Sequence, residues 1–107
     1  MKPANNAPIY VCMYQKLADI ARKHGYALAI HGSVGRDFDL IAVPWVETAA
    51  DPQTVVNDFV ERFAVRAIET ATIKEHGRLV YTLSLGFGEC FMDLGFTPRQ
   101  PLDKRAD

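Results

Sequence analysis

A chain of 107 residues is long enough to bury one hydrophobic core and too short for two, so we expect a single domain. Hydrophobic residues make up 49% of the sequence and charged residues 23%, a balance that excludes general disorder. The formal net charge of -1 excludes the basic excess that a dedicated nucleic-acid surface requires. The sequence has neither a signal-peptide core nor an apolar run of membrane-spanning length, so we expect a cytoplasmic protein.

The first half of the chain predicts a helix followed by two strands. Residues 1–8 are polar with two prolines and are expected to form a flexible leader. Apolar residues recur at spacings of three and four over 9–23, which predicts an amphipathic helix that ends before Gly25. Residues 26–31 are apolar enough to form a strand buried on both faces. A glycine-containing turn then leads into a strand over 37–45.

The second half predicts another helix and then mostly strands. Asp51 supplies an N-cap and Pro52 the first helical position, and an apolar stripe continues the helix to about residue 68. Alternating polarity around a glycine-containing turn at 86–89 is typical of a hairpin. The strands predicted in this half are 70–74, 79–85 and 90–96.

These elements predict the fold class and the domain boundaries. Two amphipathic helices need a sheet to cover their apolar stripes, so we expect an α+β domain over 9–99. The sheet is expected to be mixed, largely antiparallel, and built from four or five strands. A charged tail over 100–107 follows the domain.

Three aspartates stand in predicted strands rather than in loops. Asp37 and Asp39 lie two residues apart on one strand, so their side chains project from the same face, and Asp93 lies in a later strand. A charge in a strand interior loses hydration, which is costly unless the charge is paired or bound to a metal. Neighbouring carboxylates therefore predict a divalent cation with oxygen ligands, Mg²⁺ or Mn²⁺ in its place.

The sequence leaves a structural role open for each of these aspartates. Asp37 is also suited to accept backbone amides of the preceding turn. Asp39 is also suited to an ion pair. Asp93 is also suited to a salt bridge with Arg36 or Arg78.

Four further residues are candidates for binding phosphate. The turn at Gly32 and Ser33 offers backbone amides and a hydroxyl to an anion, although both residues are equally suited to forming the turn alone. Arg36 and Arg78 each carry a guanidinium fork that matches the geometry of a phosphate.

The order of these motifs resembles the nucleotidyltransferase superfamily of the DNA polymerase β type, especially its minimal stand-alone members. The resemblance is carried by Gly32 and Ser33 after an apolar strand, by the pair Asp37 and Asp39, and by Asp93 in a later strand. It implies a shortened nucleotidyltransferase fold in which the glycine and serine hold a nucleoside triphosphate through its phosphates. It also implies that the three aspartates bind two Mg²⁺ ions and catalyse nucleotidyl transfer.

The connection between the two motifs departs from this family. Only residues 34–36 separate Ser33 from Asp37, whereas active members have a longer connection with a short helix that faces the triphosphate. The segment 31–45, together with Arg78 and Asp93, also resembles small bacteriophage and prophage proteins, a likeness that carries no activity. It implies the host cytoplasm as the location.

Two functions follow from these observations. The first is a nucleotidyltransferase-like protein that binds a nucleoside triphosphate or another phosphate ligand with a divalent metal. The second is a catalytically silent phage accessory or interaction module, or an antitoxin-like partner, that keeps the fold and binds another protein. The residues assigned to the first function are Asp37, Asp39 and Asp93 for catalysis and metal binding, and Gly32, Ser33, Arg36 and Arg78 for phosphate binding.

Overall fold

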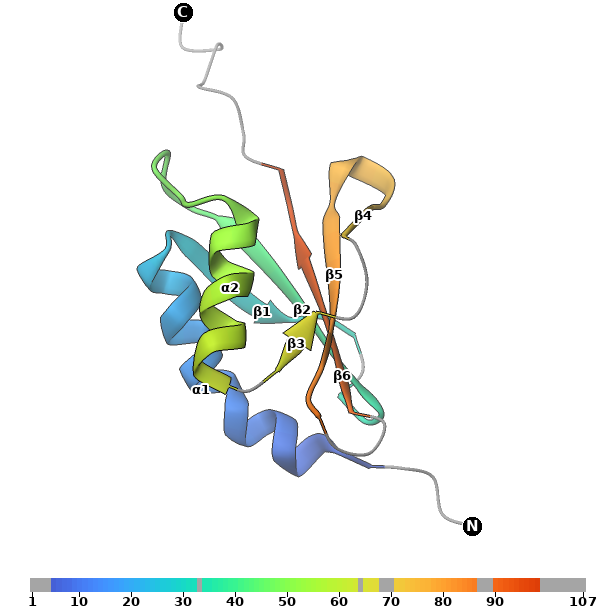
Figure 1. The fold of residues 1–107 in the computed structure, drawn as a ribbon. Helices are drawn as coiled ribbons and strands as arrows, with labels where there is room; N and C mark the ends of the chain where they lie inside the picture. The colour runs from blue at the N-terminus through green and yellow to red at the C-terminus, as the bar shows by residue number, and fades with distance from the viewer. Residues whose placement is uncertain (1–4, 33, 64, 68–70, 87–89, 99–107) are drawn as a thin grey trace, which may run out of the picture.

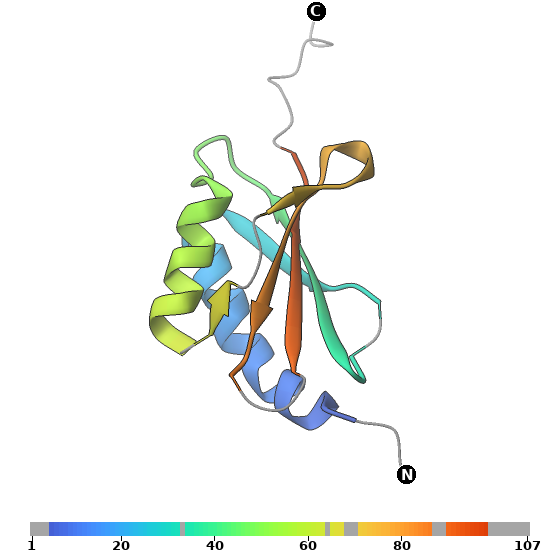
Figure 2. The ribbon, with the colours of Figure 1, turned by 45° about the vertical axis from the view of Figure 1, so that its right-hand side comes forward.

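Two helices lie on one face of a twisted sheet in the computed structural model (Figure 1, Figure 2). The structure describes residues 5–32, 34–63, 65–67, 71–86 and 90–98. Its elements, in chain order, are α1 (Ala7–Lys23), β1 (Tyr26–Ile30), β2 (Asp37–Pro44), α2 (Pro52–Phe63), β3 (Arg66–Ala67), β4 (Thr72–Ile73), a 3-10 turn (Glu75–Gly77), β5 (Leu79–Ser84) and β6 (Phe91–Phe96). No described helix covers the other face of the sheet.

The sheet is mixed, and its central pair is parallel. The strands lie in the order β1, β2, β6, β5, and the short strands β3 and β4 both pair with the outer edge of β5. Strands β2 and β6 run parallel, and every other pairing is antiparallel. The predicted α+β class with a largely antiparallel sheet is therefore confirmed, with six strands among the described residues rather than four or five.

The additional strand comes from a region predicted to be helical. Helix α2 ends at Phe63 rather than near residue 68, and Arg66 then pairs with Ser84 of β5. The apolar pattern continues past the helix because Val65 is buried in the same core. At the other end of the chain, α1 begins before residue 9, with Pro8 in its first turn, where a missing N–H costs no hydrogen bond.

The first strand is buried on one face only, which corrects the prediction. Tyr26 and Leu28 are buried, whereas Ala27 and Ala29, which alternate with them, are exposed. Strand β1 pairs with β2 alone at the border of the sheet, and the helices cover only one of its faces. Its small apolar side chains on the other face consequently remain in solvent.

Some predicted segments lie wholly or partly outside the described residues. These are residues 1–4 of the leader, Ser33, residues 87–89 of the hairpin turn and the tail 100–107. On either side of that turn, β5 and β6 pair antiparallel as predicted, and the Leu85 amide donates to the Cys90 carbonyl at 3.0 Å. None of the described helices combines the length and apolar composition needed to cross a membrane.

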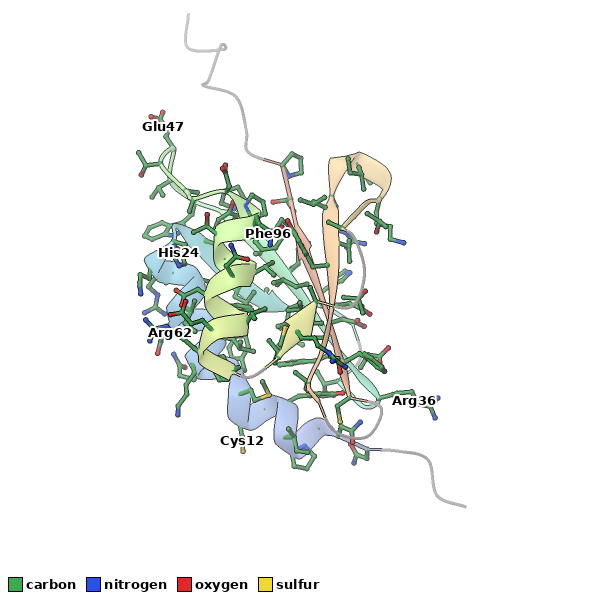
Figure 3. All side chains as sticks on the ribbon, in the orientation of Figure 1. Cys12, His24, Arg36, Glu47, Arg62 and Phe96 are labelled. Carbon is green, nitrogen blue, oxygen red and sulfur yellow. The ribbon has the colours of Figure 1, made fainter. Side chains whose placement is uncertain are left out.

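The core lies between the helices and the alternate residues of the central strands. Phe38, Leu40 and Ala42 of β2 are buried, as their alternation predicts, and Phe38 stacks on Tyr10 of α1 with ring centroids 4.9 Å apart. The ring of Phe96 from β6 also packs into this layer (Figure 3). The opposite sides of β2 and β6 are thereby turned toward the uncovered face.

An ionic cluster links the two helices outside the core. His24, the residue after α1, contacts the Asp58 carboxylate of α2 through its Nε2 at 2.8 Å. Arg62 donates to the same carboxylate from its Nε at 2.7 Å. These contacts with His24 and Arg62 hold the pKa of Asp58 below its usual value, so the carboxylate stays charged and anchors α2 against the end of α1.

Replacing Phe38 by alanine is expected to lower the free energy of unfolding by about 3 to 5 kcal/mol, because the change leaves a cavity against Tyr10. Urea unfolding followed by circular dichroism measures this loss. Trp45, an aromatic residue just beyond β2 that is 62% exposed, is the matched control, and Trp45→Ala is expected to change stability little. Equal losses for the two variants would contradict this location of the core.

Candidate functional site

The predicted acidic residues lie on the uncovered face of the sheet. Asp37 and Asp39 occupy half-buried positions of β2 that alternate with buried ones. In the parallel register of β2 and β6, Asp39 pairs directly with Asp93, whereas Asp37 pairs with Phe91. The structure therefore brings Asp39 and Asp93 together from strands that are distant in sequence, with Asp37 beside them.

The two paired carboxyls interact strongly. Burial raises the pKa of Asp39, and the adjacent Asp93 raises it further through its charge and a hydrogen bond between the side chains. Asp37 adds to this rise, and His31 opposes it. The charges of neighbouring carboxyls repel each other, and a cation between them relieves that repulsion.

Neighbouring residues hold this pair in place. The Thr82 hydroxyl, opposite Asp93 in β5, donates to Asp93 Oδ1 at 3.1 Å. On the other side, Gly32 approaches Asp39 so closely that a Cβ at this position would stand 3.1 Å from Asp39 Oδ2. The φ of Gly32 is +87°, a conformation that favours glycine. Gly32 thus lies against the Asp39 carboxyl, and its lack of a side chain leaves room for Asp39 Oδ2.

Basic residues line the same hollow of about 390 Å³ as the carboxyls of Asp39 and Asp93. Arg78 precedes β5, Lys74 follows β4, and His31 follows β1. The turn between β4 and β5 holds the first two, because the Lys74 amide donates to the Arg78 carbonyl at 2.7 Å. Arg78 Nη1 reaches to 3.5 Å from His31 Nε2. Asp39 and Asp93 form the acidic side of this hollow, and Arg78, Lys74 and His31 form its basic side. The two sides meet at His31, whose amide donates to the Asp39 carbonyl at 2.7 Å.

The two charged sides form no ion pair with each other among the described residues. Within the described part of the chain, no ion pair joins Asp93 to Arg78 or to Arg36, so the salt bridge that the sequence left open is not formed. Arg36 does not line the hollow, and its side chain extends away from the sheet at the start of β2 (Figure 3). Its backbone carbonyl instead accepts the hydroxyl of Tyr10.

The number of metal-binding side chains at the hollow restricts how a metal ion could be bound there. Among the described residues, no group of three or more histidine, cysteine, aspartate or glutamate side chains is arranged to hold a metal ion. Asp39 and Asp93 form a pair, which suits Mg²⁺ bound through one or two carboxylates, with waters and phosphate oxygens as its other ligands. A two-metal site on all three aspartates stays a prediction.

Sequence reasoning missed several residues of the hollow, namely His31, Lys74, Thr82 and Gly95. Strand alternation had already put Thr82 and Gly95 on the outward faces of their strands, and a glycine inside a strand signals close approach by another group. The position of Lys74 had no comparable signal, because it depends on the pairing of β4 with β5.

Fold and site together define an α+β protein with a mixed-charge hollow on the uncovered face of its sheet. In comparisons with known proteins, the chain matches no family model, no curated protein and no solved structure.

Replacing Asp39 by asparagine is expected to raise the melting temperature by a few degrees at about pH 7 in EDTA, because the change removes a repelling charge at little steric cost. The pKa of Asp39 is higher in the folded than in the unfolded state, so its negative charge destabilises the fold. This destabilisation reaches its full size at pH values above the folded-state pKa. This penalty disappears as the pH falls below the unfolded value near 3.8. The gain should therefore vanish at about pH 3.

Asp37→Asn is the matched control for this measurement, because Asp37 lies on the same strand and face but pairs with Phe91. It is expected to give a smaller gain than Asp39→Asn. A loss of stability in Asp39→Asn at neutral pH would identify Asp39 as a structural acceptor instead.

Proposed function

We propose that this protein binds a phosphorylated ligand, foremost a nucleoside triphosphate, together with a divalent cation in the hollow on the uncovered face of the sheet. One observation carries the proposal: the paired carboxyls of Asp39 and Asp93 line the same hollow as Arg78, Lys74 and His31. A ligand with phosphate groups and a bound cation complements both sides.

The acidic side supplies the cation ligands in this proposal. A divalent ion between Asp39 and Asp93 would cancel the repulsion that raises the Asp39 pKa, and it would neutralise charge on the phosphate. Thr82 keeps the Asp93 carboxyl oriented while the ion binds. Relief of the repulsion between the carboxyls thus adds to the affinity for the cation.

The basic side supplies the phosphate contacts. Arg78 offers the planar fork that matches two phosphate oxygens, and Lys74 adds a compact positive charge from the same turn. Arg36 belongs to this side only if its exposed side chain turns back toward the sheet.

Nucleotidyl transfer is the activity that this binding would serve in a shortened nucleotidyltransferase fold. Transfer requires the α-phosphate to be held in line with an acceptor while the charge on the leaving pyrophosphate is neutralised. The short connection 34–36 has no helix to hold the triphosphate tail. We therefore propose a binding protein whose transfer activity is low when the protein is isolated.

A catalytically silent interaction module is the second candidate. It is favoured by two large apolar side chains in solvent, Trp45 at 62% and Ile73 at 74% exposed. It is also consistent with the lack of a three-residue metal group in the described part of the chain. In this case the fold would serve a protein partner, as an accessory or antitoxin-like protein does.

Isothermal titration with ATP, GTP, CTP and UTP is expected to give Mg²⁺-dependent binding with a Kd of order 0.1 to 1 mM. Asp39→Asn should abolish the dependence on Mg²⁺, and Arg78→Ala should weaken binding about tenfold or more because it removes a charge-assisted contact. Arg22→Ala on α1, distant from the hollow, is the matched control and should bind like the wild type. If no nucleotide binds at any Mg²⁺ concentration, the interaction module becomes the better account.

Incubation with α-labelled nucleotides and candidate acceptors, protein or RNA, is expected to give little or no labelled product with the isolated protein. The physical reason is that the described residues 34–36, which lead into Asp37, form no helix that could hold the triphosphate. Strong labelling that Asp39→Asn abolishes would contradict the low activity and would establish the protein as a transferase.

A further inference from the structure

Gly95 is the exception to the alternation of β6. Phe91 and Asp93 on the uncovered face are half-buried, but Gly95 on the same face is fully buried. The Arg78 side chain covers it: a Cβ at position 95 would stand 3.0 Å from Arg78 Cδ and 3.4 Å from both Cγ and Nε. Any larger side chain there would have to displace Arg78.

The backbone itself does not require glycine at this position. Gly95 lies inside β6, between Leu94 and Phe96, and it is not among the glycines with positive φ. A glycine in a strand interior weakens the strand and is typical of a place where another group approaches closely. The space taken by Arg78 is therefore the physical reason for glycine at position 95.

One N–H donor of the Arg78 guanidinium has no hydrogen-bond acceptor among the described residues. Its Nε is the one buried side-chain polar atom without a hydrogen-bond partner in the described part of the chain. Its Nη1 lies 3.5 Å from His31 Nε2, which also lines the hollow. Nε stays packed against Gly95, so the Nη groups at the tip of the guanidinium are the donors that an oxyanion in the hollow can reach.

We infer that Gly95 is a positioning residue for Arg78: the missing side chain lets the arginine lie along the sheet and present its guanidinium to an oxyanion of the ligand. This inference rests on the proposed function for the identity of the ligand as a phosphate. The position of Arg78 itself can be measured without any ligand.

The ligand-free test is hydrogen exchange of the Arg78 Nε–H, followed by NMR. In the wild type this buried hydrogen should exchange slowly, and Gly95→Ala should speed its exchange because the added methyl lifts the side chain from the strand. Ala27→Val, which enlarges an exposed side chain on β1, is the matched control and should leave the exchange unchanged. Unchanged Nε exchange in Gly95→Ala would overturn the inference.

The ligand test is a double-mutant cycle with Mg²⁺ and inorganic tripolyphosphate as the probe. Gly95→Ala should weaken binding about fivefold in the wild-type background and have no effect in Arg78→Ala, because position 95 acts only through Arg78. Equal effects in both backgrounds would overturn the inference. If Gly95→Ala unfolds the protein, Arg78→Ala should restore its stability by removing the clash, and a failure to restore it would also count against the inference.

The two proposals fail in different ways. If the wild type binds no tripolyphosphate and no nucleotide, the proposed function fails, while the Nε exchange still decides whether Gly95 positions Arg78. If tripolyphosphate binds equally to the wild type and to Gly95→Ala, the proposed function stands and the role of Gly95 is refuted.

Discussion

The parallel register between β2 and β6 determines which of their residues lie in the core and which lie on the uncovered face of the sheet. Each strand turns its buried apolar residues toward the helices and its aspartates toward the uncovered face, and the pairing of Asp39 with Asp93 also aligns Phe38 with Met92. Because side chains alternate with a period of two, a slip of one residue would turn the carboxyl of one strand toward the helices. Burying a charge there without a partner is costly, so the core and the acidic pair enforce the same register.

Coverage by helices on one face makes the other face available for a site. Helices α1 and α2 pack on the sheet and are linked by His24 and Asp58, while the opposite face carries the charged groups. Each strand on that face contributes side chains from a different part of the sequence. The hollow is thus assembled by the sheet itself rather than by a long loop.

The separation of charge within the hollow distinguishes it from an ordinary salt-bridge network. At Asp58 the basic groups contact the carboxylate and lower its pKa, whereas at Asp39 burial and Asp93 raise it. Arg78 lies over Gly95 and extends toward His31, and it does not form an ion pair with Asp93. Carboxyls and cations that line one hollow without pairing are arranged for a third component between them.

The sequence alone determined most of the elements and the alternation of faces in the two central strands. Local periodicity was sufficient for α1, for the start of α2 at Pro52 and for the outward direction of Asp37, Asp39 and Asp93, because each depends on neighbouring residues. Only the tertiary structure decided which aspartates pair, that the apolar pattern after Phe63 becomes β3, and that Lys74 and Arg78 line the hollow while Arg36 does not. These outcomes depend on strand order and on contacts between distant segments, and local periodicity carries no information about either.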